Sequence, residues 1–543
     1  MTPLSKCNHW INRNILELGR EMRLSYLPPL MVYVAAGISG LTNIVGTFFV
    51  KEYLGLTAEF LAALGFWAGM PWALKMPLGH LVDLIWRFKS VLVFIGAALI
   101  AISLLIMMGL LSNPGGMQKI LPAEAWFVIS TLLAPIGYVV QDVVADAMTV
   151  EAIPNLDAEG RPFDKEALRL MHTTMQTLGR VAIISGGILV AGLNIYMFQG
   201  ADGLDEIGKV SVYIDIYQLA LTIPFVSVFG VSLGLCLKWR DLKHLQSRGH
   251  SFKAAWDILN TQEEKPKANR WILGGSLIFV GFTLGVGLSD VPFNQEIIFF
   301  GSMAIVLFLL FRLVEELDTE ARRTLVGTAI IIFVFRAVPT PGPGSTWWMI
   351  DELGFDQQFL SVLSFIGGTL TLLGMFVFRR FIAEKSIAYL AAALTVASTL
   401  LALPSVGMYY GLHEWTAGLT GGIVDARFIA VVDTALESPL GQIAMIPMLA
   451  WIANSAPSRL KATYFAVMAS FTNLALSASQ LGTKYINQIF TVTREVKDPL
   501  SGIVATPADY SELGALLITV TLLVLSLPLM TIVLIHRSKL QSA

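Results

Sequence analysis

The segment Gln141-Asp-Val-Val-Ala-Asp-Ala-Met-Thr-Val-Glu151 ends an apolar run that begins near Trp126. A run of this length is typical of a membrane-spanning helix, so its acids lie within the membrane or at its edge. Asp142 and Asp146 are four residues apart and share one helical face, whereas Glu151 lies off that face. A carboxylate at the centre of a bilayer costs at least ~2.5 kcal/mol and usually faces a bundle interior, a partner or water. The pair predicts a substrate or proton pathway, with a structural ion pair as the alternative.

The composition is that of a polytopic membrane protein. Of the 543 residues, 55% are hydrophobic and only 14% are charged, against about 25% charged residues in an ordinary soluble chain. The net charge of -2 gives no indication of nucleic-acid binding. The two cysteines, Cys7 and Cys236, predict neither a disulfide framework nor a cysteine metal site. The N-terminal stretch has no signal-peptide core, so the first membrane helix is expected to serve as its own insertion signal.

Fourteen apolar stretches are candidate membrane spans, each long enough to cross a ~30 Å hydrocarbon core. An even number of spans places both ends of the chain on one side. Most of the 37 lysines and arginines fall on the termini and on the loops of that side, which predicts that both ends are cytoplasmic. The candidate spans are 27–50, 59–83, 90–112, 124–149, 168–198, 211–237, 271–289, 295–314, 324–340, 358–379, 386–406, 426–454, 460–489 and 512–535.

The distribution of these spans predicts two halves. Residues 1–237 are expected to form an N-terminal six-helix half, and residues 324–543 a C-terminal one. The basic connection 238–270 between them is the longest predicted cytoplasmic loop, and residues 251–259 within it predict a short amphipathic helix on the membrane surface. Residues 271–323 hold two spans with almost no intramembrane charge, which predicts an inserted two-helix hairpin. The alternative is that these two spans belong to the second half.

A second motif, Gly79-His-Leu-Val-Asp-Leu-Ile-Trp-Arg-Phe-Lys89, lies at the predicted cytoplasmic end of the second span. Glycine permits close approach of helices, and Asp83 and Arg87 are able to form charge-assisted contacts with a neighbouring helix end. The pattern resembles the loop between helices two and three of the major facilitator superfamily, where it acts as a conformational latch. The resemblance implies an all-α polytopic membrane protein of the major-facilitator type, with two six-helix halves and, in this chain, a two-helix insert.

Several further short motifs are distributed along the chain. They are Phe49-Val-Lys-Glu-Tyr-Leu-Gly-Leu56, Met70-Pro-Trp-Ala-Leu-Lys-Met-Pro-Leu-Gly79, the stretch around Asp142 and Asp146, Phe335-Arg-Ala-Val-Pro-Thr-Pro341 with Leu353-Gly-Phe355, Ala456-Pro457, Ala462-Thr-Tyr-Phe-Ala466 and Ser470-Phe-Thr-Asn473. These motifs resemble the folate–biopterin transporter family, and they occur in that family's order. Two features depart from the family pattern: Lys461 stands where an acidic residue is expected, and the two-helix insert is not typical. Muropeptide permeases share the superfamily and a similar acidic pattern in the fourth helix, so they are a close alternative.

The second half contains an acidic pair of its own. Asp433 and Glu437 are four residues apart, on the span that would be pseudo-equivalent to the span holding Asp142 and Asp146. Parallel repeats in transporters place equivalent helices around one central cavity. The two pairs therefore predict a shared cavity, with local capping near the extracellular entrance as the alternative for the second pair.

Three basic residues, Lys75, Arg180 and Arg336, lie inside predicted spans. An arginine stays charged and binds a carboxylate bidentately. Each arginine is therefore predicted either to bind an anionic substrate or to neutralise one of the acids. Lys75 is a further candidate for substrate binding or coupling, with pairing to an acid or snorkelling to the interface as the alternative. The sequence shows no Walker lysine, metal-binding helix motif or nucleophile elbow, so we expect no enzymatic activity, no cofactor and no metal.

These features predict a secondary transporter in which rocking of two halves exposes a central cavity to each side in turn. Without a nucleotide-binding motif, proton symport is the expected energy source, with Asp146 and Asp142 as the first protonation candidates and Asp433 and Glu437 next. The family resemblance implies a small-molecule substrate such as a folate or pterin, carried across a bacterial cell membrane. The alternatives are a permease for muropeptides or another organic anion, and a non-transporting assembly or delivery factor on the same fold.

Overall fold

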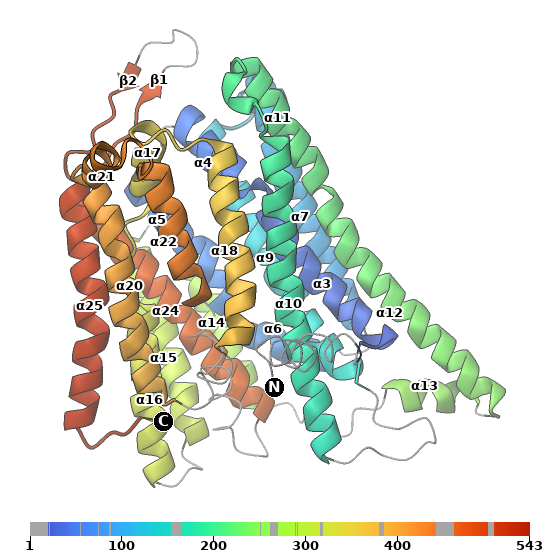
Figure 1. The fold of residues 1–543 in the computed structure, drawn as a ribbon. Coiled ribbons are helices and arrows are strands. Elements are labelled where there is room, and N and C mark those ends of the chain that lie inside the picture. The colour runs from blue at the N-terminus through green and yellow to red at the C-terminus, as the bar shows by residue number, and fades with distance from the viewer. Residues whose placement is uncertain are drawn as a thin grey trace, which may run out of the picture.

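The computed structural model describes residues 20, 22–54, 56–73, 75–85, 88–153, 165–249, 251–260, 270–287, 289, 291–314, 319–378, 385–440, 461–497 and 504–542. Almost all regular structure in these residues is helical, and most of the helices run along one common direction (Figure 1). The prediction of an all-α polytopic fold is confirmed. A two-stranded antiparallel sheet, β1 (Val496–Lys497) with β2 (Val504–Thr506), lies at one end of the bundle.

The helices of the first part of the chain follow its apolar runs. Helix α7, for example, has no charged residue after its first position, Lys89, so its whole length is compatible with lipid or an apolar core. Prolines occur inside α5 and α9, which membrane helices tolerate because neighbouring groups satisfy the freed carbonyls. The elements are η2 (Leu24–Tyr26), α3 (Leu27–Ile38), η3 (Ser39–Thr42), α4 (Asn43–Tyr53), α5 (Ala58–Ala73), α6 (Lys75–Leu84), α7 (Lys89–Ser112), α8 (Pro114–Gln118), α9 (Ala123–Glu151), α10 (Lys165–Met197), η5 (Ala201–Gly203), α11 (Glu206–Ala220), α12 (Thr222–Ser247) and α13 (Phe252–Asn260).

The helices of the second part of the chain are bounded by polar caps in several places. The side chains of Asp356, Ser386 and Asp425 each accept a hydrogen bond from a backbone N–H in the first turn of the helix that follows. The elements are α14 (Arg270–Gly287), α15 (Asn294–Val314), α16 (Thr319–Arg336), α17 (Pro343–Asp351), α18 (Gln357–Val377), α20 (Ile387–Tyr409), α21 (Leu412–Thr420), α22 (Ala426–Glu437), η6 (Ser438–Leu440), α24 (Lys461–Ile489) and α25 (Leu513–Arg537).

Within the described residues, nine helical stretches are long and apolar enough to cross a membrane. All nine coincide with predicted spans. The remaining predicted spans fall on α5 with α6, on α14, α16 and α24, and on α22, where the prediction continues into residues outside the described part. The nine stretches are Leu24–Tyr53, Lys89–Ser112, Ala123–Thr149, Thr174–Met197, Glu206–Ser247, Asn294–Arg312, Gln357–Val377, Ile387–Tyr409 and Leu513–Arg537.

The two ends of the described chain and the two short strands lie at opposite ends of the helix bundle (Figure 1). The end at which the described chain starts and finishes, with α13 beside it, is called the terminal side, and the end that carries β1 and β2 is called the strand side (Figure 1). Helix α9 enters from the strand side and finishes with Glu151 on the terminal side. It is surrounded by α3, α5, α6, α7 and α10, so its acidic segment lies among helices.

Two helix pairs join the first part of the chain to the last. Helix α5 packs along α24, and α10 packs along α18. The amide nitrogen of Asn473 in α24 donates to the backbone carbonyl of Trp72 in α5 at 3.0 Å, which fixes the position of one helix on the other. A side chain at Gly65 would meet the amide of Gln480 at 2.8 Å, so the helix backbone at that point lies close to α24.

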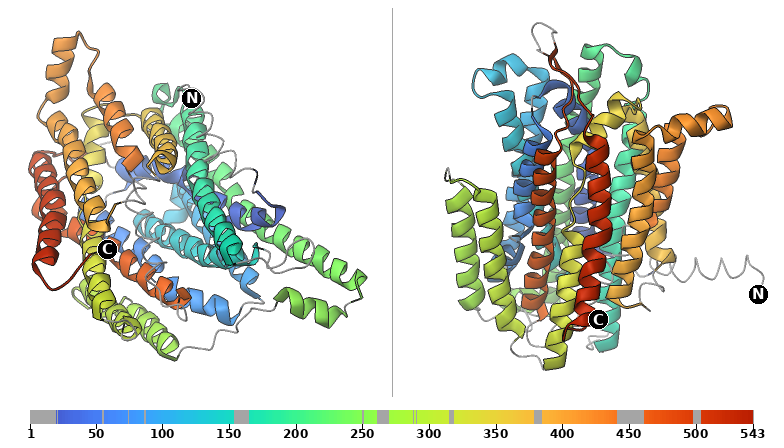
Figure 2. Two further views of the ribbon diagram at one scale, coloured as in Figure 1. Left: turned by 60° about the horizontal axis from the view of Figure 1, so that its bottom comes forward. Right: turned by 90° about the vertical axis from the view of Figure 1, so that its left-hand side faces the viewer.

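Helices α14 and α15 stand at the edge of the bundle, beside α24 (Figure 2). Phe279 and Ile298 lie in one buried apolar cluster with Phe66 of α5 and Leu474 of α24. This arrangement fits the predicted inserted hairpin. The division of the chain into two halves, a connecting loop and the insert stays a prediction.

Candidate functional site

Lys75 lies between the two carboxylates that the sequence placed on one face of α9. Its Nζ is 2.6 Å from Oδ2 of Asp142 and 2.7 Å from Oδ2 of Asp146. Lys75 is the first residue of α6, which packs on α9, so the chain brings the cation to the acidic face from a neighbouring helix. Lys75, Asp142 and Asp146 are called the charged triad below. The three residues were all predicted as site residues, and the structure brings them together.

Tyr33 of α3 completes this group, and sequence reasoning missed it. Its hydroxyl donates a hydrogen bond of 2.7 Å to Oδ1 of Asp146, so Asp146 is held by a phenol on one oxygen and by Lys75 on the other. Tyr33 is buried, in an apolar stretch of α3. A single tyrosine in an apolar helix gives no periodic or charge signal, so only the packing of α3 against α9 reveals its role.

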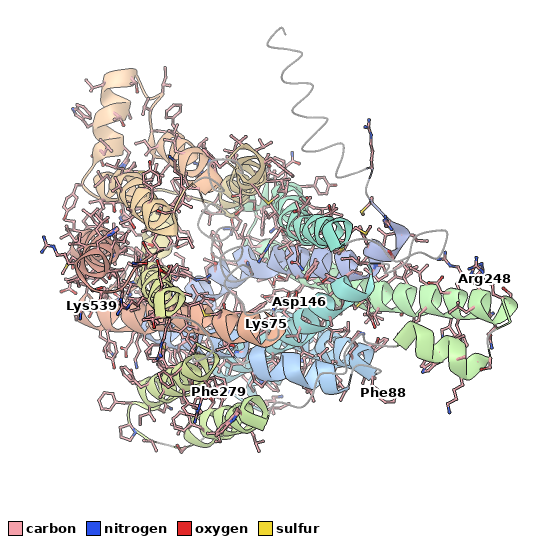
Figure 3. The ribbon with its side chains drawn as sticks, turned by 90° about the horizontal axis from the view of Figure 1, so that it is seen from below. Lys75, Phe88, Asp146, Arg248, Phe279 and Lys539 are labelled. Carbon is pink, nitrogen blue, oxygen red and sulfur yellow. The ribbon has the colours of Figure 1, made fainter. Side chains whose placement is uncertain are left out.

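The triad carries an unbalanced charge in a partly desolvated place. One cation faces two anions, which leaves a formal charge of about one negative unit if both carboxylates are ionised. The exposed fractions of the side chains are 23% for Lys75, 15% for Asp142 and 42% for Asp146. Asp146 is therefore the carboxylate that remains open to solvent, although its helix is surrounded. Figure 3 places Lys75 and Asp146 near the centre of the bundle as seen from the terminal side.

Arg180 of α10 and Arg336 at the end of α16 add positive charge nearby. Arg180 is close enough to interact electrostatically with Asp142, Tyr33 and Arg336. In the part of the chain that the structure describes, Arg180 makes no ion pair and no side-chain hydrogen bond. A guanidinium with five donors and no partner is suited to a bidentate anion.

The second acidic pair is not joined to the triad. Among the described residues, neither Asp433 nor Glu437 bonds to Lys75, Arg180 or Arg336. The Oδ1 atom of Asp433 is buried without a hydrogen-bond partner there, whereas Glu437 is exposed. The predicted sharing of one cavity by the two acidic pairs stays a prediction.

Glu151, which does not share the α9 face of Asp142 and Asp146, forms separate ion pairs. Oε1 of Glu151 is 2.6 Å from Nζ of Lys89, the first residue of α7, and 3.8 Å from Nζ of Lys238, which lies within α12. These pairs join the end of α9 to the start of α7 and to α12.

The predicted conformational latch is described only in part. Gly79 lies in α6 with no atom within 4 Å of the place where a side chain would begin. The side chain of Asp83 and all of Arg87 lie outside the described residues. Their predicted contacts stay untested.

A second polar group lies on the strand side, and the sequence analysis did not predict it. Lys51 of α4 forms an ion pair with Asp351 of α17, and the hydroxyl of Tyr510 donates to the same carboxylate at 2.5 Å. Arg494 donates from Nε to the Lys51 carbonyl at 2.9 Å and from Nη1 to the Leu56 carbonyl. These contacts join α4 and the loop that follows it to residues near the end of the chain.

Arg494 is almost fully buried, with 3% of its surface exposed, and its guanidinium lies over the ring of Trp347 at 4.6 Å. Burial lowers the pKa of Arg494 to about 10, so the side chain is still charged at neutral pH. Burial and the neighbouring Asp351 raise the pKa of the Tyr510 phenol, so it remains a donor. Lys51, Trp347, Asp351, Arg494 and Tyr510 are called the strand-side clasp.

The described residues contain no group of three or more histidine, cysteine, aspartate or glutamate side chains placed to hold a metal ion. The described polar side chains form ion pairs and hydrogen bonds, and several cations among them are exposed. Such groups bind and release solutes or protons.

The model of the BT1 family matches residues 302–542 of the chain. The folate-biopterin transporter of Synechocystis sp. is 21% identical over 484 residues, which cover 87% of this chain and 76% of that protein. The resemblance to the folate–biopterin transporter family is confirmed. The residues that suggested it come from both ends of the chain, and the match to the Synechocystis protein likewise extends over most of its length.

Solved structures with a similar fold include a peptide transporter and a nucleoside transporter. A peptide transporter POT in complex with alafosfalin superposes with a TM-score of 0.56 at 14% identity, covering 95% of this chain and 94% of that one. The nucleoside transporter NupG gives a TM-score of 0.53 at 12% identity, with 94% and 99% coverage. At such identities the likeness concerns the fold. Together with the folate–biopterin transporter resemblance, it supports an integral, multi-pass membrane transporter and not an enzyme.

Proposed function

We propose that the protein is a secondary active transporter that moves a folate or pterin-like solute by alternating access, coupled to protons. The observation that carries the proposal is the charged triad. A lysine shared by two carboxylates near the centre of a transporter fold is costly to desolvate, and such groups within a membrane usually belong to a transport pathway.

The geometry of the triad supports proton coupling at Asp146. Asp146 is the more exposed of the two carboxylates and shares Lys75 with Asp142. A proton on Asp146 would leave Lys75 paired with Asp142 alone and would change which groups are free to bind a solute. Asp142 is the second candidate for protonation because it is less open to solvent. Asp433 and Glu437 follow because they have no described link to the triad.

The charges around the triad are compatible with a folate or pterin. The edge of a pterin ring offers hydrogen-bond donors that a carboxylate accepts, and a folate tail offers carboxylates that Arg180 and Arg336 would bind. Arg180 is the better candidate for the tail because it has no described partner, while Asp142 and Asp146 are candidates for the ring. The relative from Synechocystis is named a folate-biopterin transporter, which agrees with this class of solute.

Alternating access needs two bodies and a closure on each side. We propose residues 1–237 and 324–543 as the bodies, joined by 238–270 and by the inserted hairpin 271–323. The strand-side clasp links residues from both bodies, so this structure corresponds to a state closed on the strand side. Following the distribution of basic residues, the terminal side would face the cytoplasm and the membrane would be the cell membrane of a bacterium.

The test is uptake of labelled folate into proteoliposomes under an inward proton gradient. Wild type is compared with Asp146→Asn and with Asp215→Asn, an exposed acid of α11 that serves as the matched control. We expect gradient-driven uptake by wild type and by Asp215→Asn, and loss of the gradient dependence in Asp146→Asn.

Two outcomes would revise this proposal. Uptake that remains gradient-driven in Asp146→Asn would keep the solute and remove Asp146 from coupling. No folate uptake by folded wild type would remove the solute class and favour a muropeptide or other organic anion, or a non-transporting assembly factor.

A further inference from the structure

A surface formed by α12 and α13 on the terminal side carries cations beside exposed aromatic rings. Helix α12 extends beyond the neighbouring helices, and α13 returns alongside it (Figure 1). Seen from the terminal side, Arg248 lies at the far end of this pair, well away from Lys75 and Asp146 (Figure 3). The surface is therefore separate from the candidate transport site.

The two helices form a packed unit. Leu242 of α12 is 1% exposed and Ala255 of α13 is 0% exposed, as expected where two helices share an apolar contact. The hydroxyl of Ser251 accepts a hydrogen bond from the N–H of Ala254 at 3.2 Å and so caps the first turn of α13. Helix α13 is thus held in a defined orientation along α12.

Large apolar side chains of this unit remain exposed. The stripe of α12 that includes Phe225 and Phe229, which are 72% and 62% exposed, ends at Trp239, which is 54% exposed. A tryptophan at the end of a lipid-facing stripe is typical of the membrane–water interface. Phe252 of α13 is 52% exposed, and its ring stacks on Trp256 with centroids 6.0 Å apart. These rings would lie at the depth of lipid headgroups.

The charge on the same unit is positive. Lys243, Arg248 and Lys253 are exposed, and among the described residues none of them forms an ion pair or a side-chain hydrogen bond. The neighbouring Arg240 is different, because it pairs with Asp241 at 3.3 Å. Three exposed cations with no acidic partner among the described residues, on the same two helices as aromatic rings expected at headgroup depth, are complementary to an anionic membrane surface.

We propose that the α12–α13 surface binds anionic phospholipids. Lys243, Arg248 and Lys253 would contact the headgroup phosphates, and Trp239 and Phe252 would insert beside the first carbons of the acyl chains. Because the last part of α12 and all of α13 belong to the connection between the two bodies of the proposed transporter, the bound lipids would hold that connection against the membrane.

The test uses the full chain, with a polarity-sensitive fluorophore on Ala254→Cys, an exposed position of α13, in a background without Cys7 and Cys236. The purified protein is titrated with mixed micelles that contain either phosphatidylglycerol or phosphatidylcholine. We expect a blue shift that saturates with phosphatidylglycerol and not with phosphatidylcholine, and that weakens as salt is raised. The variant Lys243→Gln/Arg248→Gln/Lys253→Gln should raise the apparent Kd at least about 10-fold, since each cation near an anionic surface contributes a several-fold factor.

The matched control removes three cations at the opposite edge of the same side. Arg323, Arg537 and Lys539 are exposed there, and Lys539 lies across the molecule from Arg248 (Figure 3). The triple glutamine variant at these positions should leave the titration unchanged. Equal titration by the two lipids, an unchanged Kd in the first variant, or an equal loss in the control would each overturn the proposal. Quenching of the label by brominated lipid in wild type, reduced in Phe252→Ser, would support insertion of the ring.

Discussion

At the scale of single residues, Lys75 compensates the negative charge of two carboxylates near the centre of the protein. It is within 2.6 Å and 2.7 Å of two carboxylate oxygens, and no other described cation pairs with either acid. The two carboxylates would otherwise repel each other across one turn of α9. The lysine therefore makes the acidic face compatible with folding, while its sharing leaves each acid incompletely neutralised.

The first prediction concerns the loss of this shared cation. We expect Lys75→Gln to lower stability by about 2 kcal/mol, less than the ~3–5 kcal/mol for breaking a fully buried pair, because Asp146 is 42% exposed. The melting temperature of the purified protein in detergent is the measurement. Lys119→Gln, at an exposed position, is the control and should have no effect.

A second substitution, which removes one of the two carboxylates, tests the physical cause of this loss of stability. Removing one of the two acids in the lysine-free protein should relieve the repulsion between them. Lys75→Gln/Asp142→Asn should therefore melt higher than Lys75→Gln alone. A double variant that is no more stable than the single variant would show that carboxylate repulsion is not the cause.

The sequence predicted the members of the triad because charged residues in apolar spans are rare and visible. The spacing of Asp142 and Asp146 also gave their common face. It could not give the pairing with Lys75, because that pairing depends on how α6 packs against α9. The same reason hid Tyr33, whose hydroxyl acts only through a contact 113 positions away in the chain.

At the scale of helices, the close contact of α3 with α10 depends on two glycines. A side chain at Gly186 would meet the backbone carbon of Gly37 at 2.9 Å, and one at Gly37 would overlap the carbonyl of Ile183. The contact matters for the candidate site because α3 carries Tyr33 and α10 carries Arg180.

The second prediction uses this contact. Gly186→Ala should lower the melting temperature, because backbone atoms of α3 would have to move to accept the methyl group. Gly187→Ala is the matched control: its methyl group would meet only the Gly37 carbonyl oxygen at 4.0 Å, so it should be neutral or slightly stabilising. Equal effects of the two substitutions would argue against the close packing described here.

The strand-side clasp is also a property of elements, because it joins α4 and α17 to the loop before α25. Arg427 offers a comparison on the same side. It donates to the Gly354 carbonyl at 2.9 Å and to Asp356 at 2.8 Å, and it lies over Phe359, so its partners are all within the last part of the chain. Arg494 also lies over a ring of the second part, Trp347, but its hydrogen bonds go to the Lys51 and Leu56 carbonyls of the first part.

The third prediction follows from that difference. Arg494→Ala should open the strand side and lengthen the distance between spin labels at Lys119 and Thr420, measured by double electron–electron resonance. Arg427→Ala should leave the distance unchanged. Because the pKa of Arg494 is about 10, both protonation and the wild-type distance should stay constant between about pH 6 and 8. A distance that changes equally in both variants would remove the clasp as the cause of closure.

The boundary between α11 and α12 could not be predicted from the hydropathy pattern. The predicted span 211–237 is divided in the structure between α11 and α12, which meet at Leu221. Near that point the hydroxyl of Thr222 donates to the carbonyl of Leu219 at 2.7 Å, and Pro224 has no N–H to continue the helical pattern. Apolar side chains continue through the junction, so hydropathy alone does not register the change.

At the scale of the whole molecule, the proposed closure of the strand side predicts from which direction the triad is reached. The fourth prediction is that a membrane-impermeant maleimide reacts with Gln176→Cys from the terminal side. Gln176 is exposed and lies one helical turn before Arg180, on the terminal-side part of α10. Lys119→Cys should react from the strand side. The experiment uses sealed vesicles of known orientation and a background without the native cysteines.

Reaction of Gln176→Cys from the strand side in wild type would contradict this direction of access. Combining Gln176→Cys with Arg494→Ala gives a further comparison, because opening the clasp should admit the reagent from the strand side. The same vesicles would also reveal which side faces the cytoplasm.

The membrane spans and the fold class could be predicted from the sequence, but the contacts between distant helices could not. Hydropathy located the spans, and the order of short motifs predicted the family, because both are local properties of the chain. The pairing of α5 with α24 and of α10 with α18 joins segments hundreds of residues apart. Such pairings depend on which helix surfaces are complementary in shape, and a single sequence does not show that complementarity.

The position of the α14–α15 hairpin makes the two joints of the molecule unequal. At the α5–α24 joint, the backbone carbonyl of Ala63 accepts from Gln295 at 3.3 Å, and Lys484 pairs with Glu296 at 3.0 Å, so the hairpin is fastened to both sides of that joint. At the α10–α18 joint, Leu189 and Leu373 are 63% and 48% exposed. In the proposed alternating access, the first joint would move against protein and the second against acyl chains, so the viscosity of the bilayer should resist the motion of one side of the molecule more than the other.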